Sequence, residues 1–127
     1  MTNTPAPAVV LLSGGIDSTV LLHCVAKRMG RRPAHALSFH YGQRHARELE
    51  CARWQAETLG VAAHRVVGLE FLGEMLAPGS ALIAGGAAVP DLAALAPGER
   101  VQPPTYVPNR NMMLLSIAAA YAEAQGI

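Results

Sequence analysis

The chain has 127 residues, of which 51% are hydrophobic and 15% charged, and its formal net charge is +1. This length is sufficient for one domain with one hydrophobic core, and the composition is that of an ordinary globular protein rather than a disordered one. The small net charge favours no polyanionic partner. We therefore expect no direct contact with nucleic acid.

Two observations concern location and the reactive side chains that are available. The N-terminus lacks a basic leader region, and no apolar stretch approaches the roughly 20 residues that cross a bilayer, so we expect a cytoplasmic protein without membrane contact. Nine of the ten basic residues are arginine, and Lys27 is the only lysine. Cys24 and Cys51 do not have the spacing of a metal knuckle. We expect both to be reduced core residues and predict no metal site.

The first five predicted elements alternate between strand and helix. An apolar strand is predicted over residues 8–12, a helix over 17–29 with Gly30 as its stop, and a second strand over 34–41. A charged amphipathic helix over 45–59 ends at Gly60, and a third strand covers 63–69. This order indicates an α/β fold, a Rossmann-like open parallel sheet with helices on both faces, in one domain over residues 1–127.

The last third of the chain divides into a predicted loop and a predicted helix. Residues 77–105 contain five prolines and four glycines and are interpreted as a long loop or insertion. Asn109 is expected to cap a helix that runs to Gln125. This helix is apolar nearly all round, so we expect it to be buried against close neighbours.

The stretch SGGIDS, residues 13–18, lies between the first predicted strand and the first predicted helix. Gly14 and Gly15 can take backbone angles that turn successive N–H groups inward, and the helix N-terminus adds unpaired N–H groups and a positive dipole end. Such a nest can hold a pyrophosphate without a lysine. The alternative is an ordinary Gly-Gly turn, with Asp17 placed to complement the helix dipole.

Two further stretches place polar side chains at sites where nucleotides bind in open parallel sheets. SFHYGQRHARELECA, residues 38–52, puts Tyr41 and the residues after it at the end of the second strand. YVPNRNMMLLSIAAAYA, residues 106–122, puts Arg110 and Asn111 at a helix N-terminus, a second position that favours anions. The alternatives are a solvated loop before a charged helix, and a plain N-cap followed by a solvent-facing arginine.

Taken together, these stretches carry a resemblance to known enzymes. SGGxDS resembles the pyrophosphate loop (PP-loop) of the ATP pyrophosphatase superfamily, whose members cleave ATP between the α and β phosphates. SGGxDS, FHYGQRHxxE and VPxRNxxxLSxAxxYA in this order resemble the 7-cyano-7-deazaguanine synthase family, the ExsB-like enzymes of queuosine and archaeosine precursor synthesis. The resemblance implies a ligase that uses ATP to convert 7-carboxy-7-deazaguanine and ammonia to a nitrile.

The same resemblance implies which residues form the site. The ATP-binding residues would be Leu12, Ser13, Gly14, Gly15, Ile16, Asp17, Ser18 and Thr19. The substrate would be bound by Tyr41, Gln43, Arg44, Arg110 and Asn111. The chemistry would fall to Asp17, Arg44, His45 and Arg110. Mg²⁺ is expected with ATP, and Asp17 could be its ligand or a brace for the loop. His45 could carry a proton to or from ammonia, or could only hydrogen-bond at a helix N-terminus.

The sequence departs from the family pattern at its C-terminal end. The family continues with a further strand and a four-cysteine zinc site, so Zn²⁺ is implied by the family although its ligands are absent here. We expect the sheet to stop after the third strand and the helix that follows. The edge of the first strand should then favour a homo-oligomer or completion by a missing C-terminal half. Two other functions stay open: a non-catalytic nucleotide-binding or partner module, and a PP-loop ligase for a different acid.

Overall fold

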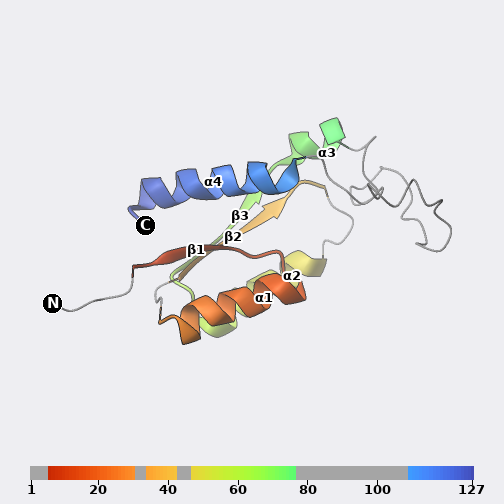
Figure 1. Ribbon diagram of the computed structural model, residues 1–127. Coiled ribbons are helices and arrows are strands. Elements are labelled where there is room, and N and C mark those ends of the chain that lie inside the picture. The colour runs from red at the N-terminus through yellow and green to blue at the C-terminus, as the bar shows by residue number, and fades with distance from the viewer. Residues whose placement is uncertain (1–5, 31–33, 43–46, 77–108) are drawn as a thin grey trace, which may run out of the picture.

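The computed structural model describes residues 6–30, 34–42, 47–76 and 109–127 (Figure 1). The predicted loop over 77–105 lies outside the described residues. The elements, in chain order, are strand β1 (Ala8–Leu11), helix α1 (Ile16–His23), π-helix η1 (Cys24–Arg28), strand β2 (Ala34–His40), helix α2 (Arg47–Leu59), strand β3 (Ala63–Gly68), helix α3 (Glu70–Leu76) and helix α4 (Arg110–Gln125).

The three strands form one parallel sheet in the order β1-β2-β3. The β1–β2 register runs from the Ala8 and Ala34 pair to the Leu11 and Leu37 pair. β3 pairs along the other edge of β2, which is therefore the central strand of the described sheet. A parallel sheet brings the carboxyl ends of its strands to one edge, so the residues that directly follow β1 and β2 lie near each other.

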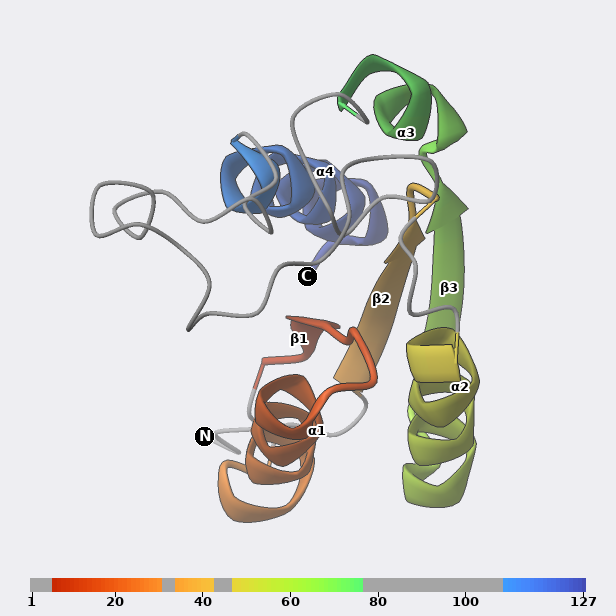
Figure 2. The ribbon, with the colours of Figure 1, turned by 90° about the vertical axis from the view of Figure 1, so that its right-hand side faces the viewer.

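Helices cover both faces of this sheet, as the sequence predicted. α1 and α2 lie on one face, and α4 lies on the other (Figure 2). Successive side chains of a strand point to opposite faces, so Val10 and Leu12 pack into the core beneath α1 and α2. Val9 and Leu11 pack into the core beneath α4. The predicted fold class is confirmed.

The helices differ from the predictions in two places. The helix predicted over 17–29 is one helical segment whose last part, η1, is a π-helix. Helix α3 was missed, in part because Gly73 at its centre disfavours helix formation. In the structure a β-carbon at Gly73 would overlap the carbonyl oxygen of Tyr41. The glycine therefore allows α3 to pack closely against the end of β2.

The predicted burial of the last helix is wrong for most of its surface. Ala118 is the buried residue of α4, whereas the side chains of Met112 and Leu115 are 65% and 55% exposed. Among the described residues, apolar neighbours lie only along the stripe of α4 that faces the sheet, and none of these residues covers the opposite side of the helix. The apolar composition therefore did not predict which side of α4 would be covered.

Two smaller predictions also need correction. Asn109 precedes α4 in the left-handed region, with φ 52°, and its side chain makes no capping hydrogen bond. Both cysteines are free thiols, but Cys51 is exposed and Cys24 is only partly buried, so neither is a core residue. The buried face of α2 carries Leu49, Ala52 and Ala56 at helical spacing, and Cys51 lies off that face. Among the helices of the described residues, none has the length and hydropathy needed to span a bilayer.

Candidate functional site

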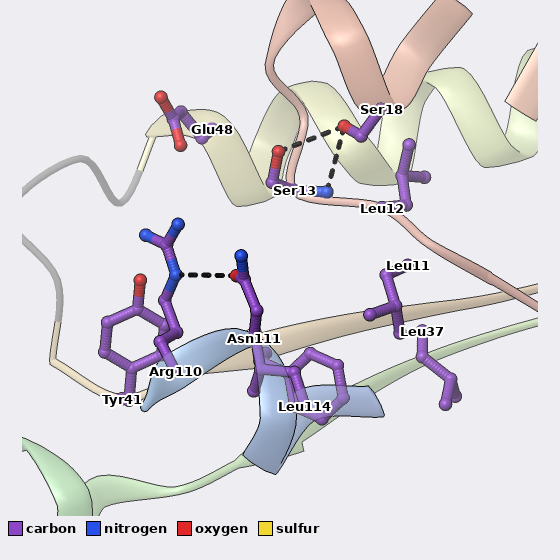
Figure 3. Close-up of a pocket in the computed structure, with 11 residues that line it drawn as sticks. Leu11, Leu12, Ser13, Ser18, Leu37, Tyr41, Glu48, Arg110, Asn111 and Leu114 are labelled. Atoms are coloured by element: carbon purple, nitrogen blue, oxygen red, sulfur yellow. Dashed lines mark hydrogen bonds between the residues drawn. The ribbon is translucent and has the colours of Figure 1, made fainter. Parts of the chain in front are cut away.

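A pocket of about 370 Å³ opens at the carboxyl ends of β1 and β2, next to the start of α4 (Figure 3). Apolar side chains form one part of its wall: Leu11, Leu12, Leu37, Phe39 and Leu114. Polar side chains form the rest: Ser13, Ser18, Tyr41, Glu48, Arg110 and Asn111. A cavity with an apolar wall and a few convergent polar groups is the usual form of a small-molecule site.

The loop between β1 and α1 depends on a glycine at one position. Gly14 has φ +92°, and a β-carbon there would overlap the carbonyl oxygen of Glu48 and lie 2.7 Å from its carbonyl carbon. Gly14 therefore lets the loop lie directly against the first turn of α2. Gly15 has φ −74° and ψ 170°, which any residue can adopt. The prediction that both glycines take unusual angles is right for Gly14 and wrong for Gly15.

Two serine hydroxyls close this loop (Figure 3). The backbone N–H of Ser13 donates to Ser18 Oγ at 3.1 Å, and the N–H of Gly15 donates to Ser13 Oγ at 3.2 Å. The two hydroxyl oxygens lie 3.0 Å apart, and the Ser18 hydroxyl also donates to the carbonyl of Gly15 at 3.3 Å. The N–H groups of Ser13 and Gly15 thus both donate to serine oxygen atoms. The oxygen atoms of a bound anion could accept these two hydrogen bonds instead.

Leu12, the residue before the loop, is fixed by two hydrogen bonds to strand β2. Leu12 donates its N–H to the carbonyl of Leu37 at 2.8 Å, and its own carbonyl accepts the hydroxyl of Ser38 at 2.5 Å. Ser38 is fully buried, and its oxygen lies 2.8 Å from Nε2 of His64 on β3. Burial, with a smaller contribution from the charge of Arg53, lowers the pKa of His64, and Glu57 opposes this shift.

The start of α4 supplies the positive charge of the pocket. Arg110 and Asn111 extend from the first turn of α4 toward the side of the pocket that carries Ser13, and Tyr41 lies beside Arg110 (Figure 3). The Arg110 Nε donates to Asn111 Oδ1 at 3.3 Å. The unpaired N–H groups of a helix N-terminus add to the guanidinium charge. This part of the pocket is suited to an anion.

The structure brings together six of the predicted site residues: Leu12, Ser13, Ser18, Tyr41, Arg110 and Asn111. Gly14, Gly15 and Thr19 belong to the loop and the first turn of α1 but do not line the pocket. Ile16 and Asp17 are exposed and also lie outside its wall. The predicted residues Gln43, Arg44 and His45 lie outside the described residues.

Five residues that line the pocket were not predicted. Leu11, Leu37, Phe39 and Leu114 carry no sequence signal beyond that of core residues. Glu48 is the glutamate of the FHYGQRHxxE stretch, so its place in that motif was a signal that could have been used. Its carboxylate supplies the acidic group of the described pocket wall (Figure 3).

The described residues contain no group of three or more histidine, cysteine, aspartate or glutamate side chains that could hold a metal ion. Zn²⁺ therefore has no fitting site in the described part of the chain, since structural zinc is held by four such ligands. Mg²⁺ requires less from the protein, because it is commonly held by one or two carboxylates together with phosphate and water oxygens. Glu48 fits that role.

Comparison with known proteins supports the assignment of the fold. The chain resembles the solved structure of an NH3-dependent NAD synthetase from Campylobacter jejuni, with a TM-score of 0.53 and 14% sequence identity, over 97% of this chain and 44% of that one. At this identity the likeness concerns the fold alone.

Comparison of sequences gives the family. The chain is 47% identical over 121 residues to a 7-cyano-7-deazaguanine synthase from Magnetococcus marinus, covering 94% of this chain and 48% of that relative. It is 50% identical over 126 residues to the enzyme of that name from Azoarcus sp., covering 99% of this chain and 51% of that relative. The chain thus spans about half the length of the curated relatives it matches. Residues 7–127 match the family described as "Queuosine biosynthesis protein QueC", and the chain belongs to that family.

Proposed function

We propose that this chain carries the ATP site of a carbon–nitrogen ligase that converts 7-carboxy-7-deazaguanine and ammonia to 7-cyano-7-deazaguanine. Membership of the queuosine biosynthesis family supports the reaction. The single observation that carries the proposal is the pocket, in which the Ser13–Ser18 loop and Arg110 lie on the same cavity. The loop offers N–H and hydroxyl donors, and Arg110 offers a permanent positive charge.

The reaction explains the need for ATP. Converting a carboxylate and an ammonium ion to a nitrile removes both carboxylate oxygens, as two molecules of water in the net balance. Oxide and hydroxide are poor leaving groups, so the carboxylate must first be joined to a phosphate. ATP cleavage between the α and β phosphates joins the carboxylate to AMP and releases pyrophosphate, and ammonia then displaces AMP to form the amide. The amide oxygen must be activated in the same way before it leaves, because the nitrile forms only when the second oxygen is also lost.

The described residues can stabilise the negative charge of the phosphates in that step. The backbone N–H groups of Ser13 and Gly15 now point to serine hydroxyls, and phosphate oxygens can take the place of those hydroxyls. Arg110 can pair with phosphate oxygens through two parallel N–H bonds. Donors aimed at charge that develops in the transition state are each worth about 3 to 4 kcal/mol when removed.

The apolar wall suits a flat heterocycle. Phe39, Tyr41 and Leu114 line the same pocket as the polar groups. Aromatic side chains stack on aromatic rings, and the Asn111 amide can both donate and accept hydrogen bonds. We assign this part of the pocket to the adenine of ATP or to the deazaguanine ring.

Magnesium is expected to accompany ATP. Bound Mg²⁺ would neutralise phosphate charge, and Glu48 is the pocket residue that would help to hold it. Asp17 is exposed and lies outside the pocket wall, so we assign it a supporting role at the start of α1.

Because the reaction consumes ATP, we place the enzyme in the cytoplasm.

The test is acid-dependent ATP turnover. A fusion of the chain to the C-terminal half of a full-length relative, such as the Azoarcus enzyme, is incubated with Mg²⁺, ATP, ammonium and 7-carboxy-7-deazaguanine, because the chain alone spans about half of that relative. AMP, pyrophosphate and the nitrile are measured by mass spectrometry and a coupled pyrophosphate assay. We expect pyrophosphate release that requires the acid and falls at least about tenfold in Arg110→Ala. ATP binding without acid-dependent turnover would contradict the ligase and favour a nucleotide-binding module.

A further inference from the structure

We infer that Ser38 is a positioning residue of the phosphate loop, although it does not line the pocket. This inference rests on the proposed function, because it assumes that the loop binds the phosphates of ATP. Ser38 lies near the end of the central strand β2 and is fully buried. Its hydroxyl reaches the carbonyl of Leu12, the residue directly before the loop.

The peptide bond between Leu12 and Ser13 links Ser38 to the loop. A trans peptide is planar, and its C=O and N–H groups point in opposite directions. The carbonyl of Leu12 accepts the Ser38 hydroxyl at 2.5 Å, and the N–H of the same peptide donates to Ser18 Oγ at 3.1 Å. A bond that fixes the oxygen on one side therefore fixes the N–H direction on the other. Ser38 thus aims the first donor of the loop.

His64 fixes Ser38 in turn. The single hydroxyl hydrogen of Ser38 is used on Leu12, so Nε2 of His64 donates to the hydroxyl oxygen across 2.8 Å. The lowered pKa of His64 is consistent with the neutral ring that this arrangement uses. Consecutive hydrogen bonds strengthen one another in a buried site. The relay runs from β3 through β2 to the end of β1, and so ties the loop to the whole described sheet.

A buried serine hydroxyl needs a partner in any protein, so a purely structural role must be separated from a positioning role. Ser38→Ala removes the hydroxyl with little change in volume, and Ser38→Thr retains it. The matched control is Tyr121→Phe, which removes the hydroxyl that lies 2.9 Å from His35 Nδ1 near the opposite end of β2. Each change to Ala or Phe removes one hydroxyl that bonds to a different element of the fold, but only the Ser38 hydroxyl contacts the residue before the loop.

Two measurements test the inference. The first is hydrogen exchange of the Ser13 amide, followed by NMR without nucleotide. The second is ATP affinity, followed by calorimetry with Mg²⁺. In Ser38→Ala we expect exchange of the Ser13 amide to be at least about tenfold faster, and ATP binding about tenfold weaker. Ser38→Thr should restore both values toward wild type, and Tyr121→Phe should change neither.

Wild-type exchange at Ser13 together with wild-type ATP affinity in folded Ser38→Ala would overturn the inference. Equal effects in Ser38→Ala and Tyr121→Phe would overturn it as well, because they would indicate a general loss of stability. If Ser38→Ala does not fold, Ser38→Cys replaces it with a weaker donor and is expected to change both readouts in the same direction. Absence of ATP binding in the wild-type chain would instead contradict the proposed function, while the Ser13 exchange rates would still test the relay.

Discussion

The backbone of Gly14 lies directly against the carbonyl group of Glu48, so closely that no β-carbon fits between them. This contact joins the loop after β1 to the first turn of α2, and it brings Ser13 and Glu48 to the same pocket. This contact distinguishes Gly14 from its neighbour Gly15, which makes no such close approach, whereas the sequence alone cannot distinguish the two.

Gly14→Ala should destabilise the chain strongly, and Gly15→Ala should not. The positive φ of Gly14 costs an alanine about 1 to 2 kcal/mol, and displacement of α2 adds about 1 to 3 kcal/mol. At Gly15 a β-carbon meets only Ser13 Oγ, at 3.4 Å, which is an ordinary contact distance. Urea unfolding measures both variants. Equal losses in the two variants would show that the close approach at Gly14 does not limit stability.

Arg110→Lys should weaken ATP binding by about tenfold, because lysine keeps the charge but loses the planar pair of donors. The matched control is Arg28→Lys, since Arg28 is exposed in η1 and does not line the pocket. Calorimetric titration with ATP measures both. If the two variants bound ATP equally well, Arg110 would be an ordinary surface arginine.

Ser18→Ala should weaken ATP binding more than it destabilises the fold. The Ser18 hydroxyl contacts the N–H of Ser13, the hydroxyl of Ser13 and the carbonyl of Gly15. Its control is Ser116→Ala, which removes an exposed helical serine hydroxyl that donates to the carbonyl of Met112. We expect ATP affinity to fall about tenfold in Ser18→Ala and to stay unchanged in Ser116→Ala. The reverse order would argue against a phosphate site at this loop.

The stability of the chain should depend on pH through His64. Burial first, and the charge of Arg53 second, lower the folded-state pKa of His64 from 6.5, and Glu57 opposes them. Above pH 6.5 the ring is neutral in both the folded and unfolded states. As the pH falls below that value the unfolded chain binds the proton first, so the free energy of unfolding decreases until the folded pKa has been passed.

His64→Gln tests this dependence, because glutamine can still donate to Ser38 but does not titrate. Urea unfolding of both proteins at about pH 7.5 and about pH 5.5 should show a smaller loss of stability in His64→Gln than in the wild type. An identical loss in the two proteins would assign the pH dependence to other groups.

The fold could be predicted to a large extent because its strands and helices carry clear periodic patterns. The uninterrupted apolar run from Ala8 to Leu12 predicted the first strand of the sheet, and Gly30 and Gly60 marked two helix ends. The seven-residue helix α3 was missed, since it is short and has a glycine at its centre. The exposure of Met112 and Leu115 could not be predicted from an apolar helix, because composition does not identify the neighbours that cover it.

The sequence predicted those site residues that belong to a motif and also lie at the end of a strand or the start of a helix. Ser13 and Ser18 follow a strand directly, and Arg110 begins a helix, so motif and secondary structure indicated the same site. Ser38 and His64 gave no such signal, because a serine and a histidine in strands resemble ordinary buried polar residues. Their link to the loop depends on the β1–β2–β3 register, which becomes evident only in three dimensions.

The central claim is that the pocket holds the pyrophosphate portion of ATP. A titration of the ¹⁵N-labelled chain with Mg²⁺ and ATP, pyrophosphate or AMP, followed by NMR, tests it most directly. We predict that ATP and pyrophosphate shift the amide signals of Ser13, Gly14 and Gly15 and the side-chain signal of Arg110. AMP, which lacks the pyrophosphate, should bind at least about tenfold more weakly. Equal binding of AMP and ATP, or shifts confined to residues away from this loop, would contradict the account.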